Sequence, residues 1–313
     1  MQGSSRQTRQ VRLALMLIVG VASVAACVAA FMWWNAPAAS AQVVASPDAA
    51  FVTRCNYSHR SNDDPIVYPG QPDAAHSHAF FANRSTKYNS TYESLRTFTG
   101  TTTATKSGTT CVNPDDKSAY WIPTTSWTNN SDTRILKPST AHFYYRSGGK
   151  GDVQPPPAGL KVVPNTNVKW RCAQDTAVAP SPPTRCSSGA LVVIIRFPDC
   201  LAVDSSGQPL RDTGPNDPNP HRSHMAYAVL QSDGTKLCPD THPIPVATLT
   251  MEVKFNIGTT SGTVTLSSGD ASTMHADFFN AWDQEKLTAL VESCINAYPF
   301  SPEIPKPAEC KQV

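Results

Sequence analysis

The stretch TLTMEVKFNI, residues 248–257, shows the clearest periodicity in the chain. Every second residue is apolar, and threonine, glutamate, lysine and asparagine fill the positions between. Because successive side chains of a strand point to opposite faces, this alternation predicts a half-buried β-strand.

Other segments of the same kind lie on both sides of this stretch. LVVIIRF at 191–197 is continuously apolar and β-branched, which is typical of a strand buried on both faces. Further β-type runs are HMAYAVLQ at 224–231, GTVTLSS at 262–268, RILKPSTAHFYYR at 134–146 and NVKWRC at 167–172. Twenty-seven prolines and sixteen glycines punctuate the chain. The pattern predicts a mainly β fold, an antiparallel β-sandwich or jelly roll with long Pro/Gly loops.

One segment near the C-terminus predicts a helix. In NAWDQEKLTALVESCINAY, residues 280–298, apolar residues recur at helical spacing. The predicted buried face consists of Leu287, Leu290, Val291, Cys294 and Tyr298. Asn280 is the expected N-cap, with Asp283 three residues later as in a capping box. We expect this single helix to dock on the sandwich.

Residues 1–41 predict an export signal. Three arginines precede an uncharged apolar run at 13–34, and Ala39-Ser40-Ala41 matches the small-x-small pattern before a cleavage point. The run is also long enough to span a bilayer, which needs ~20 residues. A cleaved signal peptide and an N-terminal membrane anchor therefore both remain open. Residues 42–50 are a short linker, and 51–313 read as a single domain, extracellular or at the cell surface.

The cysteines agree with export. Eight lie beyond the leader: Cys55, Cys111, Cys172, Cys186, Cys200, Cys238, Cys294 and Cys310. An even set outside the cytoplasm predicts four disulfides, and no C-x-x-C pair favours structural zinc. The spacing favours pairing Cys172 with Cys186 and Cys294 with Cys310.

Charge and motifs exclude several classes of protein. The net charge is +2, from 26 basic and 24 acidic residues, and no basic run occurs beyond the leader. This argues against nucleic-acid binding. The sequence has no P-loop, dinucleotide fingerprint, nucleophile elbow or H-E-x-x-H, so we expect no nucleotide ligand and no common hydrolase or zincin site.

Histidines gather in three short motifs: His76-x-His78, the block 221–224 (HRSH), and His275-x-Asp277. In extended chain, residues two apart project from one face. His76, His78, His275 and Asp277 could therefore hold a divalent metal such as zinc, copper or iron. Alternatively, each histidine bonds a nearby carbonyl at the junction of a loop and a strand.

A second hypothesis is acid–base chemistry on a saccharide. A glycosidase needs two carboxylates about 5–9.5 Å apart, for which Asp64 and Asp277 are the candidates. A lyase would use His224 or Tyr227 as base and Arg222 to neutralise a substrate carboxylate. Tyr120, Trp121 and Trp282 are the expected sugar-facing rim, although each of these aromatic residues could instead belong to the core.

Six blocks occur in the order found in the DUF1996 family. They are DPIVYPGQPDAAHSHAFFAN (64–83), DKSAYWIPT (116–124), FPDC (197–200), HRSHMAY (221–227), CPDTHPIPV (238–246) and MHADFFNAWD (274–283). The chain resembles this family from about Arg54 to Ala297. The resemblance implies an exported or wall-associated protein, since members occur in secreted and surface proteins of fungi and bacteria, some beside carbohydrate-binding WSC modules. The polar residues that it highlights are Asp64, His76, His78, Lys117, Tyr120, Trp121, His224, Tyr227, His242, His275, Asp277, Asn280, Trp282 and Asp283.

The leading hypothesis is an exported enzyme, a hydrolase or lyase, acting on a polysaccharide or glycoconjugate of the cell envelope. We expect His76, His78, His224, His275 and Asp277 to converge on one cleft. The alternatives are a non-catalytic wall-binding or adhesion module, and a metal-dependent extracellular enzyme using zinc or copper.

Overall fold

The computed structural model describes residues 49–297 and 307–311, except 103–106, 131 and 165–166. The predicted leader and most of the linker lie outside these residues. Within them, no helix is long and apolar enough to cross a membrane.

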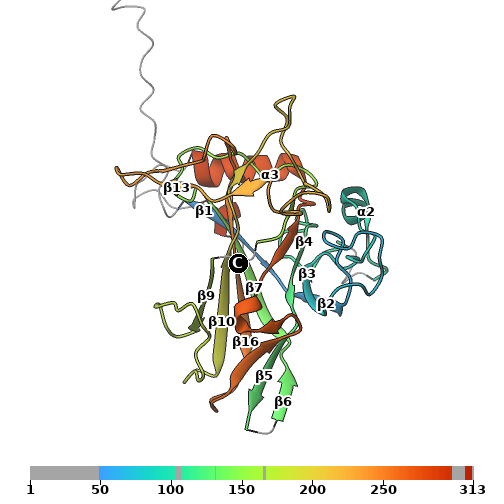
Figure 1. The fold of residues 1–313 in the computed structure, drawn as a ribbon, viewed down its shortest axis with the longest axis vertical. Helices are drawn as coiled ribbons and strands as arrows, with labels where there is room; N and C mark the ends of the chain where they lie inside the picture. The colour runs from blue at the N-terminus through green and yellow to red at the C-terminus, as the bar shows by residue number, and fades with distance from the viewer. Residues whose placement is uncertain (1–48, 103–106, 131, 165–166, 298–306, 312–313) are drawn as a thin grey trace, which may run out of the picture. The chain divides into compact units, whose positions relative to one another are not determined.

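The largest sheet contains the strands predicted most clearly from the sequence. Its order is β1 (Ala50–Cys55), β7 (Pro138–Arg146), β16 (Thr248–Asn256), β10 (Ala190–Arg196) and β9 (Val168–Cys172), all antiparallel. β16 alternates between buried and half-buried residues, and β10 is buried along most of its length, as the two patterns predict. Figure 1 shows β7, β10 and β16 running side by side through the middle of the fold.

A second five-stranded sheet carries the candidate site. Its order is β2 (Tyr57–Ser61), β3 (His78–Ala82), β4 (Ala119–Pro123), β19 (Asp277–Phe279) and β8 (Lys161–Val162), again antiparallel. All residues of β3, β4 and β19 are buried. Both faces of this sheet are therefore covered.

One face packs against the first sheet. The ring centroids of Tyr120 and Phe143 lie 4.0 Å apart, and those of Phe197 and Phe278 lie 6.2 Å apart. A separate apolar cluster covers the other face and contains Ile66, Phe80, Leu95, Ala119, Trp121, Val163, Phe279 and Ala281. The predicted mainly β, antiparallel class is confirmed, and among the described residues no sheet closes into a barrel.

Smaller sheets complete the β structure. One four-stranded sheet has the order β18 (Gly269–Asp270), β17 (Thr263–Leu266), β5 (Thr125–Asn129) and β6 (Asp132–Ile135). The short strands elsewhere are β11 (Cys200–Leu201), β12 (Met225–Ala226), β13 (Val229–Leu230), β14 (Lys236–Leu237) and β15 (Ile244–Pro245).

The single strand predicted at 224–231 is wrong. It is divided into β12 and β13 because the Ala228 N–H donates to the Asp199 carboxylate, at 3.0 Å, instead of to a neighbouring strand. The Asp199 N–H in turn donates to the Ala226 carbonyl, which bends the chain around this aspartate.

The predicted C-terminal helix is confirmed, but it starts later than expected. α3 (Gln284–Val291) continues into a π-helical turn (Glu292–Asn296), and Asp283 is its N-cap, accepting from Lys286 N at 3.1 Å. Asn280 does not cap it, because the helix begins only at Gln284 and the side-chain oxygen of Asn280 accepts from the Trp282 N–H at 3.1 Å. The side-chain amide of Asn280 donates to the carbonyls of Pro156 and Pro157.

The face of α3 that was predicted to be buried is confirmed at Leu287, Leu290, Val291 and Cys294, whereas Tyr298 lies outside the described residues. α3 lies at the opposite end of the long strands from β5 and β6, and the short helix α2 (Tyr92–Thr97) lies beside β2 and β3 (Figure 1). Two short 3-10 helices occupy Ala271–Thr273 and Ala308–Lys311.

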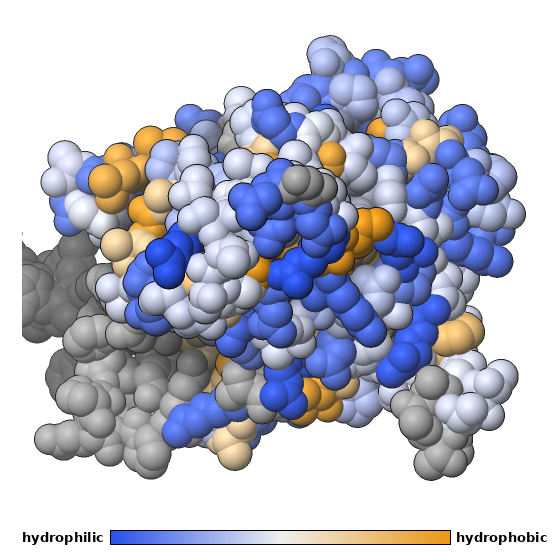
Figure 2. Space-filling model, turned by 90° about the horizontal axis from the view of Figure 1, so that it is seen from below, coloured by the Kyte–Doolittle hydropathy of each residue, from blue (hydrophilic) through white to orange (hydrophobic). Residues whose placement is uncertain are grey.

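All eight cysteines beyond the leader form disulfides. The pairs are Cys55–Cys111, Cys172–Cys186, Cys200–Cys238 and Cys294–Cys310, so both predicted pairings are confirmed. Four disulfides are consistent with an extracellular protein. On the face shown in Figure 2, most of the described residues are hydrophilic and the hydrophobic ones form small patches.

Candidate functional site

The register of the second sheet brings two of the histidine motifs together. On β4, Trp121 lies opposite Asp277 of β19, and Pro123 lies opposite His78 of β3. Residues opposite each other in an antiparallel pair share a face, as do residues two apart on one strand. His78 and Asp277 therefore project from the same face of the sheet. Since β3 and β19 both run antiparallel to β4, they enter the sheet from the same end.

The residues two positions before each strand complete the group. The ring centroids of His76 and His78 lie 4.3 Å apart, those of His76 and His275 5.2 Å, and those of His78 and His275 6.0 Å. One nitrogen of each of the three rings lies within 4.8 Å of the others. A second group, Asp64, His78 and Asp277, meets the same limit and shares His78. We call these five residues the His/Asp cluster.

Asp64 reaches the cluster from the loop that follows β2. Ser61 at the end of β2 lies opposite His78, so the chain leaves the sheet close to that histidine. One carboxylate oxygen of Asp64 accepts from the N–H groups of Ile66 and Val67, both at 2.9 Å. This local turn fixes the carboxylate, which is 4% exposed.

Several polar atoms of the cluster have no protein partner. His78 is 0% and Asp277 1% exposed. Both ring nitrogens of His78, both carboxylate oxygens of Asp277 and Nε2 of His76 are buried without a hydrogen bond of normal geometry to any described residue. The Asp63 carbonyl lies near enough to His78 to act on its pKa. An unsatisfied buried polar group costs about 1–3 kcal/mol. Because these unpartnered polar atoms lie close together, they indicate a binding site for a polar ligand or an ion.

The electrostatics of the cluster favour a bound cation. Burial, and then the neighbouring Asp64 carboxylate, raise the pKa of Asp277 well above its usual value. Burial also raises the pKa of Asp64. Burial and the neighbouring imidazoles lower the pKa of His78 well below its usual value and that of His76 to about 4. The imidazoles are thus neutral at physiological pH. Among the described residues, no lysine or arginine forms an ion pair with Asp64 or Asp277.

His275 is held in the tautomer that a metal requires. Its Nδ1 lies 2.9 Å from the carbonyl oxygen of Thr273, which can only accept, so Nδ1 carries the proton. Its Nε2 therefore presents a lone pair to the cluster, 3.8 Å from an oxygen of Asp277. His76 and His275 are half-buried and form the side of the cluster that solvent can reach.

Three imidazoles and two carboxylates match the ligands of divalent zinc, iron, manganese or copper. The structure brings His76, His78, His275 and Asp277 together, while the metal itself stays a prediction. The two carboxylates of the glycosidase hypothesis also lie close together, with one oxygen of Asp64 within 4.8 Å of one oxygen of Asp277. The acid–base hypothesis stays a prediction as well.

His224 does not join this group, which corrects the predicted convergence of all four histidines. Its Nε2 donates to the Lys161 carbonyl at 2.7 Å. The neighbouring His221 bonds the Asp212 carboxylate through Nδ1 at 2.7 Å, and His242 donates from Nε2 to the Ser223 carbonyl at 2.9 Å. These three histidines fasten the 221–224 turn to the surrounding chain.

The turn carries Arg222 into a pocket beside the cluster. The pocket has a volume of about 170 Å³ and is lined by Val162, Val163, Pro164, Pro198, Asn219, Arg222, Met225 and Tyr227. The positive charge of Arg222 acts on both Asp277 and His275. It offsets part of the rise that burial causes in the pKa of Asp277, and it adds to the fall that burial causes in the pKa of His275. Arg222 and Tyr227 were predicted from the lyase hypothesis. Asn219 was missed, because an asparagine in a Pro/Asn-rich loop carries no signal of its own.

The predicted aromatic rim is wrong, because Tyr120, Trp121 and Trp282 are all 0% exposed. The indole of Trp121 lies beneath the cluster, with its ring centroid 6.4 Å from that of His78. Trp282 and Tyr120 belong to a buried relay away from the cluster. Trp282 Nε1 donates to the Tyr145 hydroxyl at 3.1 Å, Tyr145 to Tyr120 at 2.8 Å, and Tyr120 to the Asp116 carboxyl at 3.0 Å.

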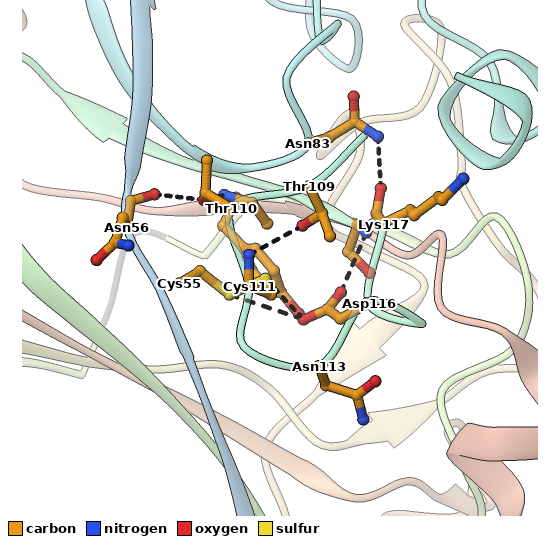
Figure 3. The surroundings of a disulfide bond; sticks show 12 residues. Cys55, Asn56, Asn83, Thr109, Thr110, Cys111, Asn113, Asp116 and Lys117 are labelled. Carbon is orange, nitrogen blue, oxygen red and sulfur yellow. Dashed lines mark hydrogen bonds between the residues drawn. A yellow bond between two sulfur atoms is a disulfide. The ribbon is translucent and has the colours of Figure 1, made fainter. Parts of the chain in front are cut away.

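Asp116 ends this relay beside the Cys55–Cys111 disulfide (Figure 3). The two sulfur atoms lie 3.9 and 3.5 Å from Asp116 Oδ2. A disulfide has neither a proton to donate nor a thiolate to ligate a metal, so these are packing contacts. Burial raises the pKa of Asp116 to about 7.

The remaining predicted contacts have structural partners. Lys117 Nζ donates to the carbonyls of Arg96 and Phe98, at 2.9 and 3.1 Å. Asp283 caps α3 and forms an ion pair with Arg96 at 2.8 Å. Asn280 binds two proline carbonyls, as described above. None of these residues belongs to the His/Asp cluster.

Comparisons with known proteins identify a family for this chain and assign no activity to it. A search of curated proteins and a search of solved structures each found no match. The family model described as a domain of unknown function, DUF1996, matches residues 64–282, which include the whole His/Asp cluster and Arg222. The chain therefore belongs to the DUF1996 family.

Proposed function

We propose that the protein is an extracellular metal-dependent enzyme whose His/Asp cluster binds a divalent transition-metal ion. The observation that carries the proposal is the set of buried, unpartnered nitrogens of His78 and oxygens of Asp277 facing each other. A cation between them would satisfy these atoms and the charge of both carboxylates at once.

The arrangement suits Lewis-acid chemistry. A metal in the cluster would polarise an oxygen of the substrate and stabilise negative charge that develops there. His76 and His275 are half-buried, so the metal would be reached from their side, whereas Trp121 and the sheet exclude water from the other. Five candidate donors exceed the three protein ligands of a typical catalytic zinc site, so one or two of them are free to act as base or to orient the substrate.

For the substrate we propose a polysaccharide or glycoconjugate of the cell envelope. This rests on the export signal read in the leader, on the four disulfides and on the polar cluster; the aromatic residues no longer support it, since they are buried. We propose that the protein acts outside the cell, either secreted or held by the apolar segment at 13–34.

A panel of envelope polysaccharides tests the proposed activity. Purified protein would be incubated with each polysaccharide after loading with zinc, manganese or copper, and again with a chelator. New reducing ends or unsaturated products are expected from the loaded protein, and the chelated protein and Asp277→Asn are expected to give none. Products that persist in both would contradict a metal-dependent reaction. Retention on a polysaccharide without products would favour the wall-binding module instead.

A further inference from the structure

We propose that the Arg222 pocket binds the carboxylate of an acidic sugar unit of the substrate, next to the metal. The inference rests on the proposed function, because it assigns the substrate class of the same site.

The first support is the state of Arg222. Among the described residues, no carboxylate lies within ion-pair distance of its guanidinium, and its Nε is buried without a hydrogen bond. By contrast, the buried Lys150 is paired with Asp199 at 2.7 Å. A guanidinium that lines a pocket with hydrogen-bonding capacity left over is suited to a planar, bidentate anion such as a carboxylate.

The second support is the way the turn holds this arginine. The two histidines on either side of it form hydrogen bonds to other parts of the fold. His221 bonds the Asp212 carboxylate and His224 bonds the Lys161 carbonyl. His221 adopts a φ of 59°, a left-handed conformation that is costly for a residue other than glycine. The hydrogen bonds of the turn hold this strained conformation, and they fix the backbone of Arg222 in place.

The third support is the chemistry of the walls. Val162, Val163, Pro164, Pro198 and Met225 are apolar, and Asn219 supplies a polar group. The Tyr227 hydroxyl donates to the Arg196 carbonyl at 2.9 Å, so Tyr227 contributes its ring to the wall. Such a surface suits the C–H face of a pyranose ring with its carboxylate on Arg222. The volume of about 170 Å³ is below the roughly 300–1,000 Å³ of pockets for drug-sized ligands. The pocket is therefore sized for one sugar unit, with the rest of a chain outside it.

The position of the pocket links this unit to the reaction. Val162, which lines the pocket, lies opposite Phe278 on β19, the residue next to Asp277. A sugar bound through its carboxylate would therefore have a neighbouring bond close to the metal. A single arginine also matches the single charge of a carboxylate better than the two charges of a phosphate monoester. We therefore expect uronate-containing polysaccharides to be preferred over neutral and phosphorylated ones.

Titration with three monosaccharides tests the inference. Zinc-loaded protein would be titrated with methyl glucuronide, methyl glucoside and glucose 6-phosphate by isothermal calorimetry or ligand-observed NMR. We expect the glucuronide to bind about tenfold or more tightly than either competitor, as a bidentate charged contact predicts. Arg222→Gln is expected to abolish this preference and to keep its zinc. Arg134→Gln, which changes an exposed arginine on β6, is the matched control and is expected to keep the preference.

The outcomes separate this inference from the proposed function. Equal binding of glucuronide and glucoside, or an unchanged preference in Arg222→Gln, would overturn the inference. If the protein still binds zinc in that experiment, the proposed metal site is not contradicted. A preference that survives in zinc-free protein and vanishes in Arg222→Gln would support the pocket without the metal. Arg222→Lys, which keeps the charge but not the planar fork, is expected to retain part of the preference, and it guards against a misfolded glutamine variant.

Discussion

At the scale of single residues, two buried side chains, His78 and Asp277, form the centre of the proposed metal site. Each would be unfavourable alone, because one is a ring with both nitrogens unsatisfied and the other a carboxyl group far from water. Together with Asp64 they form a site whose polar atoms point at one another. Burial and the Asp64 charge raise the pKa of Asp277 well above its usual value, so a cation that binds there competes with a proton.

Metal binding should therefore release protons and strengthen as the pH rises. The imidazoles of His76 and His78 have lowered pKa values and are already neutral, so the protons come from the carboxyl groups, whose pKa values are raised. Calorimetry of zinc binding in two buffers of different ionisation enthalpy measures the number released. Binding enthalpies that are the same in both buffers would contradict this expectation.

A second residue-level prediction concerns Asp116. Its pKa of about 7 in the folded chain exceeds the ordinary value of 3.8, so between these values the folded state holds a proton that the unfolded state has lost. This group's contribution is therefore fully present below pH 3.8 and is lost as the pH rises to about 7, at ~1.4 kcal/mol per pH unit.

Urea unfolding between pH 4 and 7 measures this effect. Asp116→Asn, which keeps a hydrogen-bond acceptor but cannot ionise, should show a free energy of unfolding that falls less steeply with pH than that of the unchanged protein. Asp115→Asn, at the half-buried neighbouring position, should keep the original slope. Equal slopes for all three proteins would contradict a neutral Asp116.

At the scale of elements, the cluster is a consequence of strand register. Spacing within H-x-H and H-x-D was enough to predict that each pair shares a face. Their meeting depends on β4, which inserts between β3 and β19 with Trp121 opposite Asp277. The two motifs are almost two hundred residues apart in sequence, and no local pattern encodes such a pairing. For the same reason, the sequence could not show that the His224 ring would form a hydrogen bond with the Lys161 carbonyl on β8.

The start of α3 provides a prediction at this scale. Asp283 accepts from Lys286 N and pairs with Arg96, so Asp283→Ala removes both the cap and the ion pair. The free energy of unfolding should fall by about 1–2 kcal/mol, most of it from the cap. Asp283→Asn, which can still accept the capping hydrogen bond, should lose much less. Equal losses would show that the ion pair, and not the cap, stabilises this end of the helix.

At the scale of the whole molecule, the sequence predicted the fold class correctly, but it did not predict which aromatic residues are exposed. Alternating strands, Pro/Gly loops and eight cysteines were sufficient for an antiparallel β fold with four disulfides. The sugar-facing rim failed because burial depends on how sheets stack: Tyr120 faces the first sheet, and Trp121 is covered by the loop and helix on the opposite face. An aromatic residue beside polar ones looks the same in sequence whether it lies in a cleft or in the core.

The disulfides should stabilise the molecule to different degrees. Cys55–Cys111 closes a loop with a sequence separation of 56, and Cys172–Cys186 closes one with a separation of 14. In the chain-entropy account the longer loop contributes about 1 kcal/mol more. Replacing both cysteines of a pair by alanine and measuring urea unfolding compares them. A larger loss from the shorter loop would show that native-state packing, and not loop closure, dominates.

The most direct test of the central claim is the metal content of the protein after equilibrium dialysis against zinc, manganese or copper. We expect about one tightly bound ion per chain, since dedicated sites bind with apparent energies of ~10 kcal/mol or more. His78→Ala and Asp277→Asn should each lose it, whereas His142→Ala, which changes a half-buried histidine on β7 of the other sheet, should keep it. A protein that holds no metal, or a His78→Ala variant that holds as much as the unchanged protein, would contradict the account.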